Sequence, residues 1–225
     1  MELTILSLFP EYFQGPLQVS MLKRAVEKGL LQINLVNIRD FAEGQHAQVD
    51  ERPFGGGPGM LMMAGPIVKA IRSQRKKASR VIYLTPQGKL LTAQKCKELA
   101  KEEHLILLCG HYEGVDQRAL DLEVDEEISI GDYVLTSGMP AALVVLDAIG
   151  RRVPGVVGHP EGVLQDSFED DNVFEGPQYT RPRVFEGKEA PPVLLEGHHK
   201  KIKKWRKEKG LTKAKKIRPD LAEKL

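Results

Sequence analysis

The amino-acid sequence predicts an α/β protein: a body built on a parallel sheet, followed by a small all-helical domain rich in lysine and arginine. Short apolar runs such as Arg80–Leu84 and Leu105–Cys109 are typical of strands buried on both faces. These runs alternate with segments of helical pattern through residue 150. Residues 173–225 carry 15 Lys/Arg against 7 Asp/Glu, whereas residues 1–172 carry 18 against 24. This division indicates an acidic body joined to a basic module for a polyanion.

The first forty residues predict one strand–helix–strand unit. We expect a strand at Met1–Phe9, an amphipathic helix at Leu17–Lys28 that ends at Gly29, and a second strand at Leu30–Ile38. A unit of this kind favours a parallel sheet. Phe41–Met60 is then predicted to be a long loop, and loops of this length in compact domains are usually functional or disordered.

The long loop contains the sequence GQHAQVDERPFGGGPGM. Its glycines fit neither the phosphate-loop pattern nor the dinucleotide pattern, which argues against nucleotide hydrolysis. Asp50, Glu51 and Arg52 stand beside the glycines. A substrate-facing role and a plain surface ion pair are equally compatible with these residues.

The middle of the chain continues the alternation of strands and helices. A helix is predicted at Ile67–Ala78. The basic cluster near its end suits the helix dipole or a minor RNA contact. A second helix is predicted at Thr92–Glu103, with Thr92 as the N-cap. Ile128–Leu135 is predicted to be a short strand. Met139–Ile149 carries only one charged residue and is predicted to be a helix buried on most of its surface.

Three apolar strands of this region each end in a loop of glycine, proline and small polar residues. The loops read TPQG from Thr85, GHYEG from Gly110 and TSGMP from Thr136. Ligands of open α/β sheets bind at the carboxyl ends of strands, where glycine lets the backbone approach a ligand closely. Three such loops in succession predict a small-molecule site.

The last quarter of the chain departs from this pattern. Gly155–Asn172, with four glycines or prolines and a run of acids, is predicted to be an interdomain linker. Residues 198–218 carry 11 Lys/Arg and one acid. Ile202 and Trp205 are spaced as a narrow apolar stripe of a helix requires. A small helical module with a basic face is expected, although a lysine-rich helix can also be a solubilising tail.

Composition excludes several other classes of protein. No stretch reaches the roughly 18–20 apolar residues of a membrane span, and the N-terminus lacks the basic region and cleavage site of a signal peptide. Cys96 and Cys109 have no metal-ligand spacing and are expected to be ordinary thiols in a reducing cytosol. The histidines show no metal-ligand spacing either, so no metal site is predicted. The lack of a signal peptide and the reduced thiols together lead us to expect a cytoplasmic protein.

Several motifs together carry a family resemblance. GHYEGVDQR, SIGDYVL, VDERPFGGGPGM, RRVPGV, QDSF and YTRP strongly resemble the bacterial tRNA (guanine-N1)-methyltransferase family. Members of that family methylate guanosine 37, beside the anticodon, with S-adenosylmethionine as the methyl donor. The resemblance covers nearly the whole chain.

The resemblance implies which residues form the methyl-donor site. Without it, the apolar members of this set could equally be core, and the glycines could be simple turns. The expected donor-site residues are Tyr83, Leu84, Thr85, Pro86, Gly110, Glu113, Ile130, Gly131, Asp132, Tyr133, Val134, Leu135 and Gly138. In the family the residue matching Glu113 lies beside the donor, where its negative charge offsets the positive charges of the donor.

Two further residues are expected to carry the chemistry. Guanine N1 becomes a good nucleophile only as its proton leaves, so a carboxylate within hydrogen-bond reach is the natural base. The match to the family's aspartate selects Asp166 over Asp170 and Asp171. Arg151 is expected to stabilise negative charge on guanine O6, whereas the neighbouring Arg152 fits charge complementation at a helix end better.

The resemblance also implies the architecture. Family members hold the donor in a deep trefoil knot of the SPOUT class, which ordinary folding rules would exclude, and they work as homodimers. We therefore expect a knotted domain over 1–159, a flexible linker over 160–169 and a helical tRNA-binding domain over 170–225. A magnesium ion is also associated with the family, although the sequence does not locate it.

One stretch departs from the family pattern, and two rival functions stay open. Many members read SGGELP after SIGDYVL, where this chain has Thr136-Ser137-Gly138-Met139-Pro140. The shape of this loop, and with it donor affinity, is therefore in question. The rivals are a knotted ribose 2′-O-methyltransferase and a non-catalytic RNA-binding protein.

Overall fold

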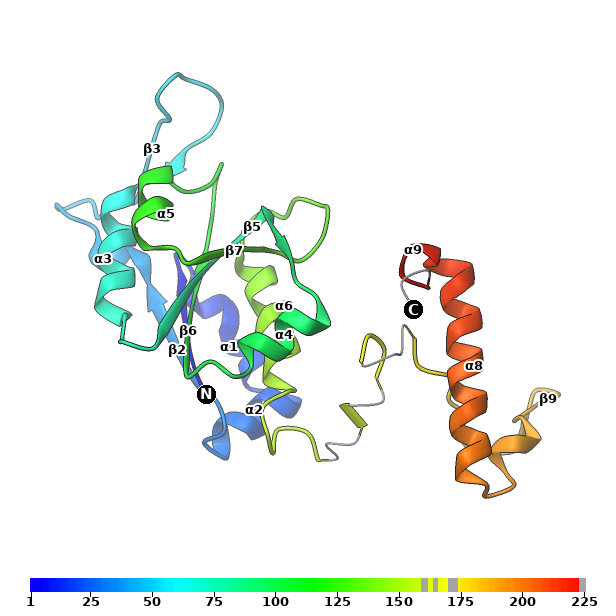
Figure 1. Ribbon diagram of the computed structural model, residues 1–225. Helices are drawn as coiled ribbons and strands as arrows, with labels where there is room; N and C mark the ends of the chain where they lie inside the picture. Colours follow the sequence, from blue (N-terminus) through cyan, green and yellow to red (C-terminus); the bar gives the residue numbers. More distant parts are fainter. Residues whose placement is uncertain (159–161, 164–165, 170–173, 223–225) are drawn as a thin grey trace. The chain divides into compact units, whose positions relative to one another are not determined.

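The computed structural model describes residues 1–158, 162–163, 166–169 and 174–222. The chain divides into two compact units, Met1–Gly158 and His159–Leu225, and Figure 1 labels their elements. Within the residues that the structure describes, no helix is both long and apolar enough to cross a membrane.

A parallel sheet of five strands forms the centre of the first unit. The strands lie in the order β2-β1-β6-β5-β7, and every neighbouring pair is parallel. The α/β class with a parallel sheet, predicted from the apolar runs, is thus confirmed. The strands are β1 (Glu2–Ser7), β2 (Gln32–Asn37), β5 (Ser79–Leu90), β6 (His104–Cys109) and β7 (Glu126–Ser129).

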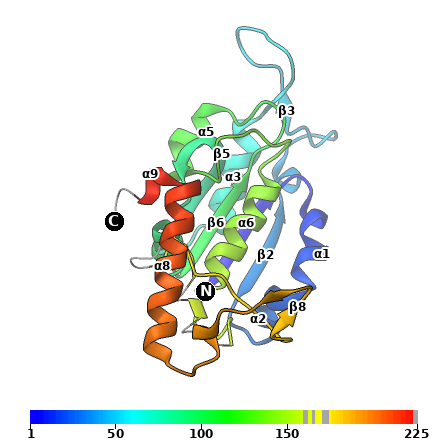
Figure 2. The same ribbon diagram turned by 90° about the vertical axis from the view of Figure 1, so that its right-hand side faces the viewer.

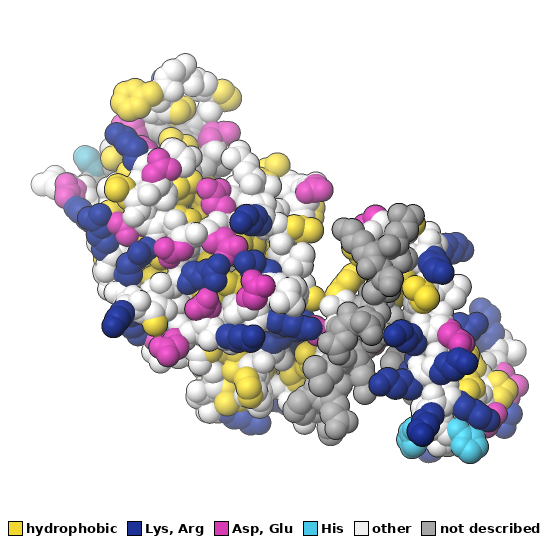
Figure 3. All heavy atoms as spheres, viewed as in Figure 1, with side chains coloured by type: hydrophobic (Ala, Val, Ile, Leu, Met, Phe, Trp, Pro, Cys, Tyr) yellow, Lys and Arg dark blue, Asp and Glu magenta, His cyan; other side chains and the backbone are white. Residues whose placement is uncertain are grey.

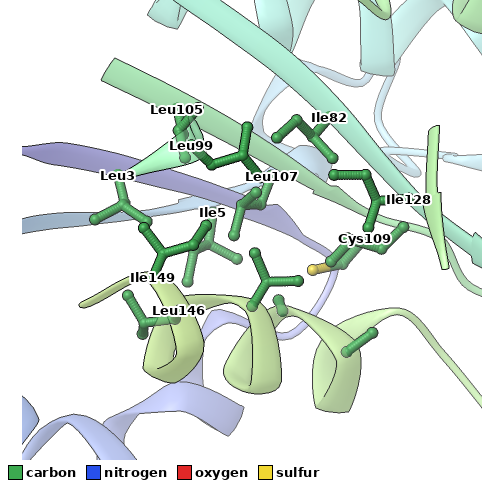
Figure 4. Close-up of a cluster of buried hydrophobic side chains, with 14 of the residues drawn as sticks. Leu3, Ile5, Ile82, Leu99, Leu105, Leu107, Cys109, Ile128, Leu146 and Ile149 are labelled. Carbon is green, nitrogen blue, oxygen red and sulfur yellow. The ribbon is translucent and has the colours of Figure 1, made fainter. Parts of the chain in front are cut away.

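Helices cover both faces of this sheet. Alternate strand residues such as Ile5 and Leu107 enter a cluster with α2, α4 and α6 (Figure 4), whereas Leu6 and Leu108 enter a second cluster with α3 and α5. In Figure 2, α6 lies across one face of the sheet and α3 across the other. The remaining elements of the unit are η1 (Pro10–Phe13), α1 (Gln14–Leu17), α2 (Ser20–Glu27), η2 (Ile38–Phe41), β3 (Asp50–Glu51), β4 (Leu61–Met62), α3 (Ala64–Gln74), α4 (Ala93–Leu99), α5 (Gln117–Glu123) and α6 (Met139–Gly150).

Several predicted boundaries were wrong. The helix expected at 17–28 begins only at Ser20, as α2, because Val19 before it is extended with φ −128° and ψ 155°. Leu17 instead ends the short helix α1. The strand expected at 128–135 ends at Ser129, where its pairing with β5 ends. The sequence also did not predict α5, of which only Ala119, Leu120 and Glu123 are buried.

The loop expected after residue 84 is instead an irregularity inside a longer strand. β5 pairs with β7 before and after residues 85–88, and its register shifts between Leu84 and Lys89. By contrast, the predicted N-cap of α4 is confirmed, because the Thr92 hydroxyl accepts a hydrogen bond from the Lys95 amide at 3.2 Å.

The second unit is organised on one long helix, α8 (His199–Ile217), followed by α9 (Pro219–Ala222). Tyr179 packs against Trp205 of α8, with ring centroids 6.3 Å apart. The unit also holds η3 (Pro192–Leu194) and a small antiparallel hairpin of β8 (Val184–Phe185) and β9 (Lys188–Glu189). The prediction of an all-helical module was therefore incomplete.

Candidate active site

A cavity of about 340 Å³ opens where β6 and β7 end and where the register of β5 shifts. The lining includes residues 83–87 of β5, residues 110–115 after β6, residues 127–131 and 133–138 at the end of β7 and after it, and Ala141 at the start of α6. The parallel sheet brings these three segments together, because β5 lies between β6 and β7. This is the place at which open α/β sheets bind ligands.

The loops after β6 and β7 touch through two glycines. The amide of Gly138 donates a hydrogen bond to the carbonyl oxygen of Gly110 at 2.8 Å. A Cβ at Gly138 would lie 3.0 Å from both Cys109 Cα and the Gly110 nitrogen. These neighbours are backbone atoms and cannot rotate away, so the close approach requires glycine at position 138. This contact brings the chain after the edge strand β7 back to β6.

Tyr83 forms part of the inner wall of the cavity. A Cβ at Gly110 would lie 2.9 Å from the Tyr83 hydroxyl oxygen, so the phenol lies directly against this glycine. Burial raises the pKa of the Tyr83 phenol, and the nearby Glu127 carboxylate raises it further. The phenol is therefore neutral at physiological pH and keeps its O–H as a possible donor to a ligand.

The loop after β7 is held in its shape by Ser129. The Ser129 hydroxyl donates to the carbonyl oxygen of Gly131 at 3.0 Å and accepts from the Gly131 amide at 3.1 Å. The Tyr133 hydroxyl donates to the Ile130 carbonyl oxygen at 3.3 Å. Val134, one of the apolar residues of the strand predicted at 128–135, is 83% exposed on this loop. Its apolar surface is thus open beside the cavity.

The structure gathers all of the expected donor-site residues at the cavity except one. Asp132 is exposed and is not among the lining residues, whereas the other members of the set are. Sequence reasoning missed His111, Tyr112 and Ser129, which also line the cavity. The first two lie within the GHYEG loop, so their place in that motif was the available signal.

Arg151 does not line this cavity. Arg151 caps the end of α6, whose twelve residues span about 18 Å at 1.5 Å per residue. Since the cavity lies at the opposite end of that helix, the two are farther apart than an arginine side chain reaches. Asp166 belongs to the second unit.

The segment that carries Asp166 is attached to the rest of the second unit. The amide of Glu175 donates to the hydroxyl of Ser167 at 3.1 Å, and the rings of Phe168 and Phe174 meet edge to face with centroids 5.9 Å apart. The carbonyl oxygen of Phe174 in turn lies so close to Gly210 of α8 that a Cβ there would be 2.1 Å away. Residues 166–169 therefore connect through Phe174 to the basic helix.

Lysine and arginine gather over α8, as Figure 3 shows. The helix carries a single acidic residue, Glu208, among its many cations. Within the described parts of the chain, no group of three or more His, Cys, Asp or Glu residues is arranged to hold a metal ion.

The fold and the cavity define the class: an α/β protein with a cavity lined by glycine-bearing loops of its parallel sheet, joined to a basic unit. The family model described as tRNA (Guanine-1)-methyltransferase TrmD matches residues 1–224. The chain belongs to this family, which confirms the resemblance seen in the motifs.

Curated relatives agree with this assignment. A tRNA (guanine-N(1)-)-methyltransferase of Protochlamydia amoebophila is 60% identical over 217 residues, which are 96% of this chain and 97% of that relative. Proteins of the same name from Chlamydia pneumoniae and Chlamydia caviae are 60% and 59% identical over 98% of this chain. The chain spans 61% and 62% of the length of these two relatives.

Proposed function

We propose that this protein transfers the methyl group of S-adenosylmethionine to N1 of guanosine 37 in tRNA, in the cytoplasm. The observation that carries the proposal is the cavity built from β5 and from the glycine-bearing loops after β6 and β7, in a chain of this family. Bound there, the donor supplies a methyl group activated on a sulfonium sulfur. The relatives' names supply the acceptor atom and the class of RNA, and the motif resemblance supplies position 37.

The lining of the cavity suits such a donor. Backbone groups of the loops at Gly110 and Gly138 can hold adenosine and methionine polar atoms, and Ile130 and Leu135 offer apolar surface. Glu113 supplies the negative charge that offsets the positive donor. The chain would reach this arrangement through the trefoil knot of its family, and the contact between Gly138 and Gly110 supports that path.

In the proposed reaction Asp166 is the general base. The N1–H proton of guanine passes to the Asp166 carboxylate as the N1–methyl bond forms, and the bond between the methyl carbon and the donor sulfur breaks. The donor leaves as a neutral thioether. Arg151 stabilises the negative charge that builds on guanine O6 during proton removal.

The position of Arg151 supports a site shared between two subunits. Arg151 lies about 18 Å along α6 from the cavity-lining end of its own helix. On α6, Val144 is 47% exposed, and Pro140, Leu143 and Ala148 beside it are only partly buried. This stripe has helical spacing and suits a second copy of α6. In an antiparallel pair, the partner's Arg151 would approach the Gly138 end.

The basic helix α8 fits sequence-tolerant contact with tRNA phosphates, which positions the RNA without reading it. The splayed bases of an anticodon loop are the usual target of sequence-specific recognition in RNA. The attachment of residues 166–169 to Phe174, which touches α8, gives RNA binding a physical route to the proposed base.

The test incubates purified protein, labelled S-adenosylmethionine and tRNA transcripts that have or lack guanosine at position 37. Labelling only of the guanosine 37 transcript, at the base, supports the proposal, whereas a methyl on ribose indicates a 2′-O-methyltransferase. If calorimetry detects no binding of the donor, the alternative of a non-catalytic RNA-binding protein is favoured. Addition of a chelator tests the magnesium requirement that the family resemblance implies.

Asp166→Asn tests the base directly. The variant should bind the donor as tightly as the wild type, since the side chain keeps its size, and should lose most transfer because the amide cannot accept the N1 proton. Wild-type turnover by Asp166→Asn would remove Asp166 from this role. Mixed dimers that carry Asp166→Asn in one subunit and a donor-site variant in the other test whether the site is shared.

A further inference from the structure

The return strand of the hairpin of β3 and β4 is joined to the cavity loop by hydrogen bonds of Met60 and Met62. The Glu113 amide donates to the Met60 carbonyl oxygen at 3.0 Å, and the Met62 amide donates to the Gly114 carbonyl oxygen at 2.9 Å. The Asp116 amide donates to the Met62 carbonyl oxygen at 3.0 Å. The glycine-rich tip of this hairpin projects from the body (Figure 1), yet its return strand is fixed to the loop that lines the cavity.

The side chain of Glu113 lies against Gly59 of this hairpin. A Cβ at Gly59 would be 2.5 Å from Glu113 Cγ and 2.5 Å from Glu113 Oε1, distances that no pair of real atoms of this kind tolerates. Gly59 also adopts φ +80°, a left-handed conformation that favours glycine. The backbone of the hairpin is therefore one wall against which the Glu113 carboxylate rests.

We infer that Gly59 is a positioning residue, which directs the Glu113 carboxylate into the donor cavity by leaving space for its side chain. This inference rests on the proposed function, in which Glu113 offsets the positive charge of the donor. The Glu113 backbone is held by Met60, so the main chain cannot follow if the side chain is pushed away. Any group added at Gly59 must turn the carboxylate out of its place.

Gly56 provides a matched control in the same hairpin. Its φ of +77° is nearly that of Gly59, and a Cβ built there meets no atom within 4 Å. Gly59→Ala and Gly56→Ala therefore carry the same backbone strain, and only the first contacts Glu113. Donor affinity is measured by calorimetry with S-adenosylmethionine and no tRNA, so that any contact of the hairpin with RNA does not enter.

We expect Gly59→Ala to weaken donor binding about tenfold or more, the effect of displacing one charge-bearing contact of ~1.4 kcal/mol, and Gly56→Ala to leave it within about twofold. Glu113→Ala removes Cγ and Oε1, so Gly59→Ala should cause no further loss of affinity in that background. If Gly59→Ala does not fold, Gly59→Asn replaces it, because asparagine tolerates a left-handed φ and carries the same Cβ.

The outcomes separate this inference from the proposed function. Equal affinities of Gly59→Ala and Gly56→Ala, or a loss at Gly59 that persists beside Glu113→Ala, would overturn the inference and leave the methyl-transfer proposal standing. Wild-type donor affinity in Glu113→Ala would also overturn it. If the wild type itself neither binds the donor nor labels tRNA, the proposed function fails, and the inference fails with it.

Discussion

Gly138→Ala should disrupt the donor cavity through one added methyl group. Gly138 adopts φ −73°, which alanine accepts, so backbone strain does not contribute. The new Cβ would instead lie 3.0 Å from Cys109 Cα and from the Gly110 nitrogen. The two loops must move apart by a few tenths of an ångström, and this stretches the hydrogen bond of 2.8 Å between the Gly138 amide and the Gly110 carbonyl oxygen.

The magnitude follows from the packing of these loops. Adding a methyl group to a close-packed contact costs about 1–3 kcal/mol, and a weakened backbone hydrogen bond adds up to about 1 kcal/mol. If the loops move apart to relieve the strain, the donor site is distorted and the affinity for the donor decreases by roughly tenfold to several hundredfold. If the loops stay in contact, the strain remains in the folded state and the free energy of unfolding decreases.

Calorimetric titration with S-adenosylmethionine and urea unfolding measure these two quantities on the same protein. Gly65→Ala is the control, because Gly65 lies in α3 and an added Cβ there meets no atom within 4 Å. It should keep donor affinity and stability, or gain slightly in stability. The reasoning is refuted if Gly138→Ala matches Gly65→Ala in both donor affinity and unfolding free energy.

Two other predictions concern stability and RNA binding. Burial lowers the pKa of the His104 imidazole below its ordinary value of 6.5, with hydrogen bonds to Thr4 Oγ1 at 3.0 Å and Ser79 Oγ at 2.7 Å. Because the folded state holds His104 neutral, this contribution to stability is present above pH 6.5 and is lost as the pH falls through the lowered pKa. Urea unfolding between pH 7.5 and 5 should show a decline in unfolding free energy that His104→Gln reduces; an unchanged slope contradicts the prediction. Lys203→Ala and Lys213→Ala, at exposed positions of α8, should each lower the slope of log affinity for tRNA against log salt by roughly 0.7–0.9, as filter binding at several salt concentrations would measure; wild-type slopes would argue against phosphate contact by this helix.

The sequence predicted best those elements in which most residues are apolar and buried. β6 is buried along its full length, so its continuous apolar run could hardly be anything other than an inner strand of a parallel sheet. α6 begins at the predicted residue and ends one residue later than predicted. In both elements the local pattern and the tertiary environment demand the same residues.

The strand prediction failed where apolar residues line the cavity instead of the core. Ile130, Val134 and Leu135 looked like the continuation of a strand, but they form a loop at the cavity. A hydrophobic sequence pattern cannot separate these two cases, because the same apolar residue types occur in a cavity lining and in a buried strand. α5 was missed for the opposite reason, since few of its residues face the core.

The sequence by itself determined the fold class, the basic character of the last quarter and, through its motifs, the family. Only the tertiary structure decided which loops meet. The order of strands brings the middle of β5 and the ends of β6 and β7 together. Asp132, unlike the other expected donor-site residues, is not in the cavity lining, and Arg151 lies at the far end of α6 from the cavity. The contact of Glu113 with Gly59 joins segments more than fifty residues apart. Such proximity depends on the packing of the sheet and its loops, which no local pattern of residues records.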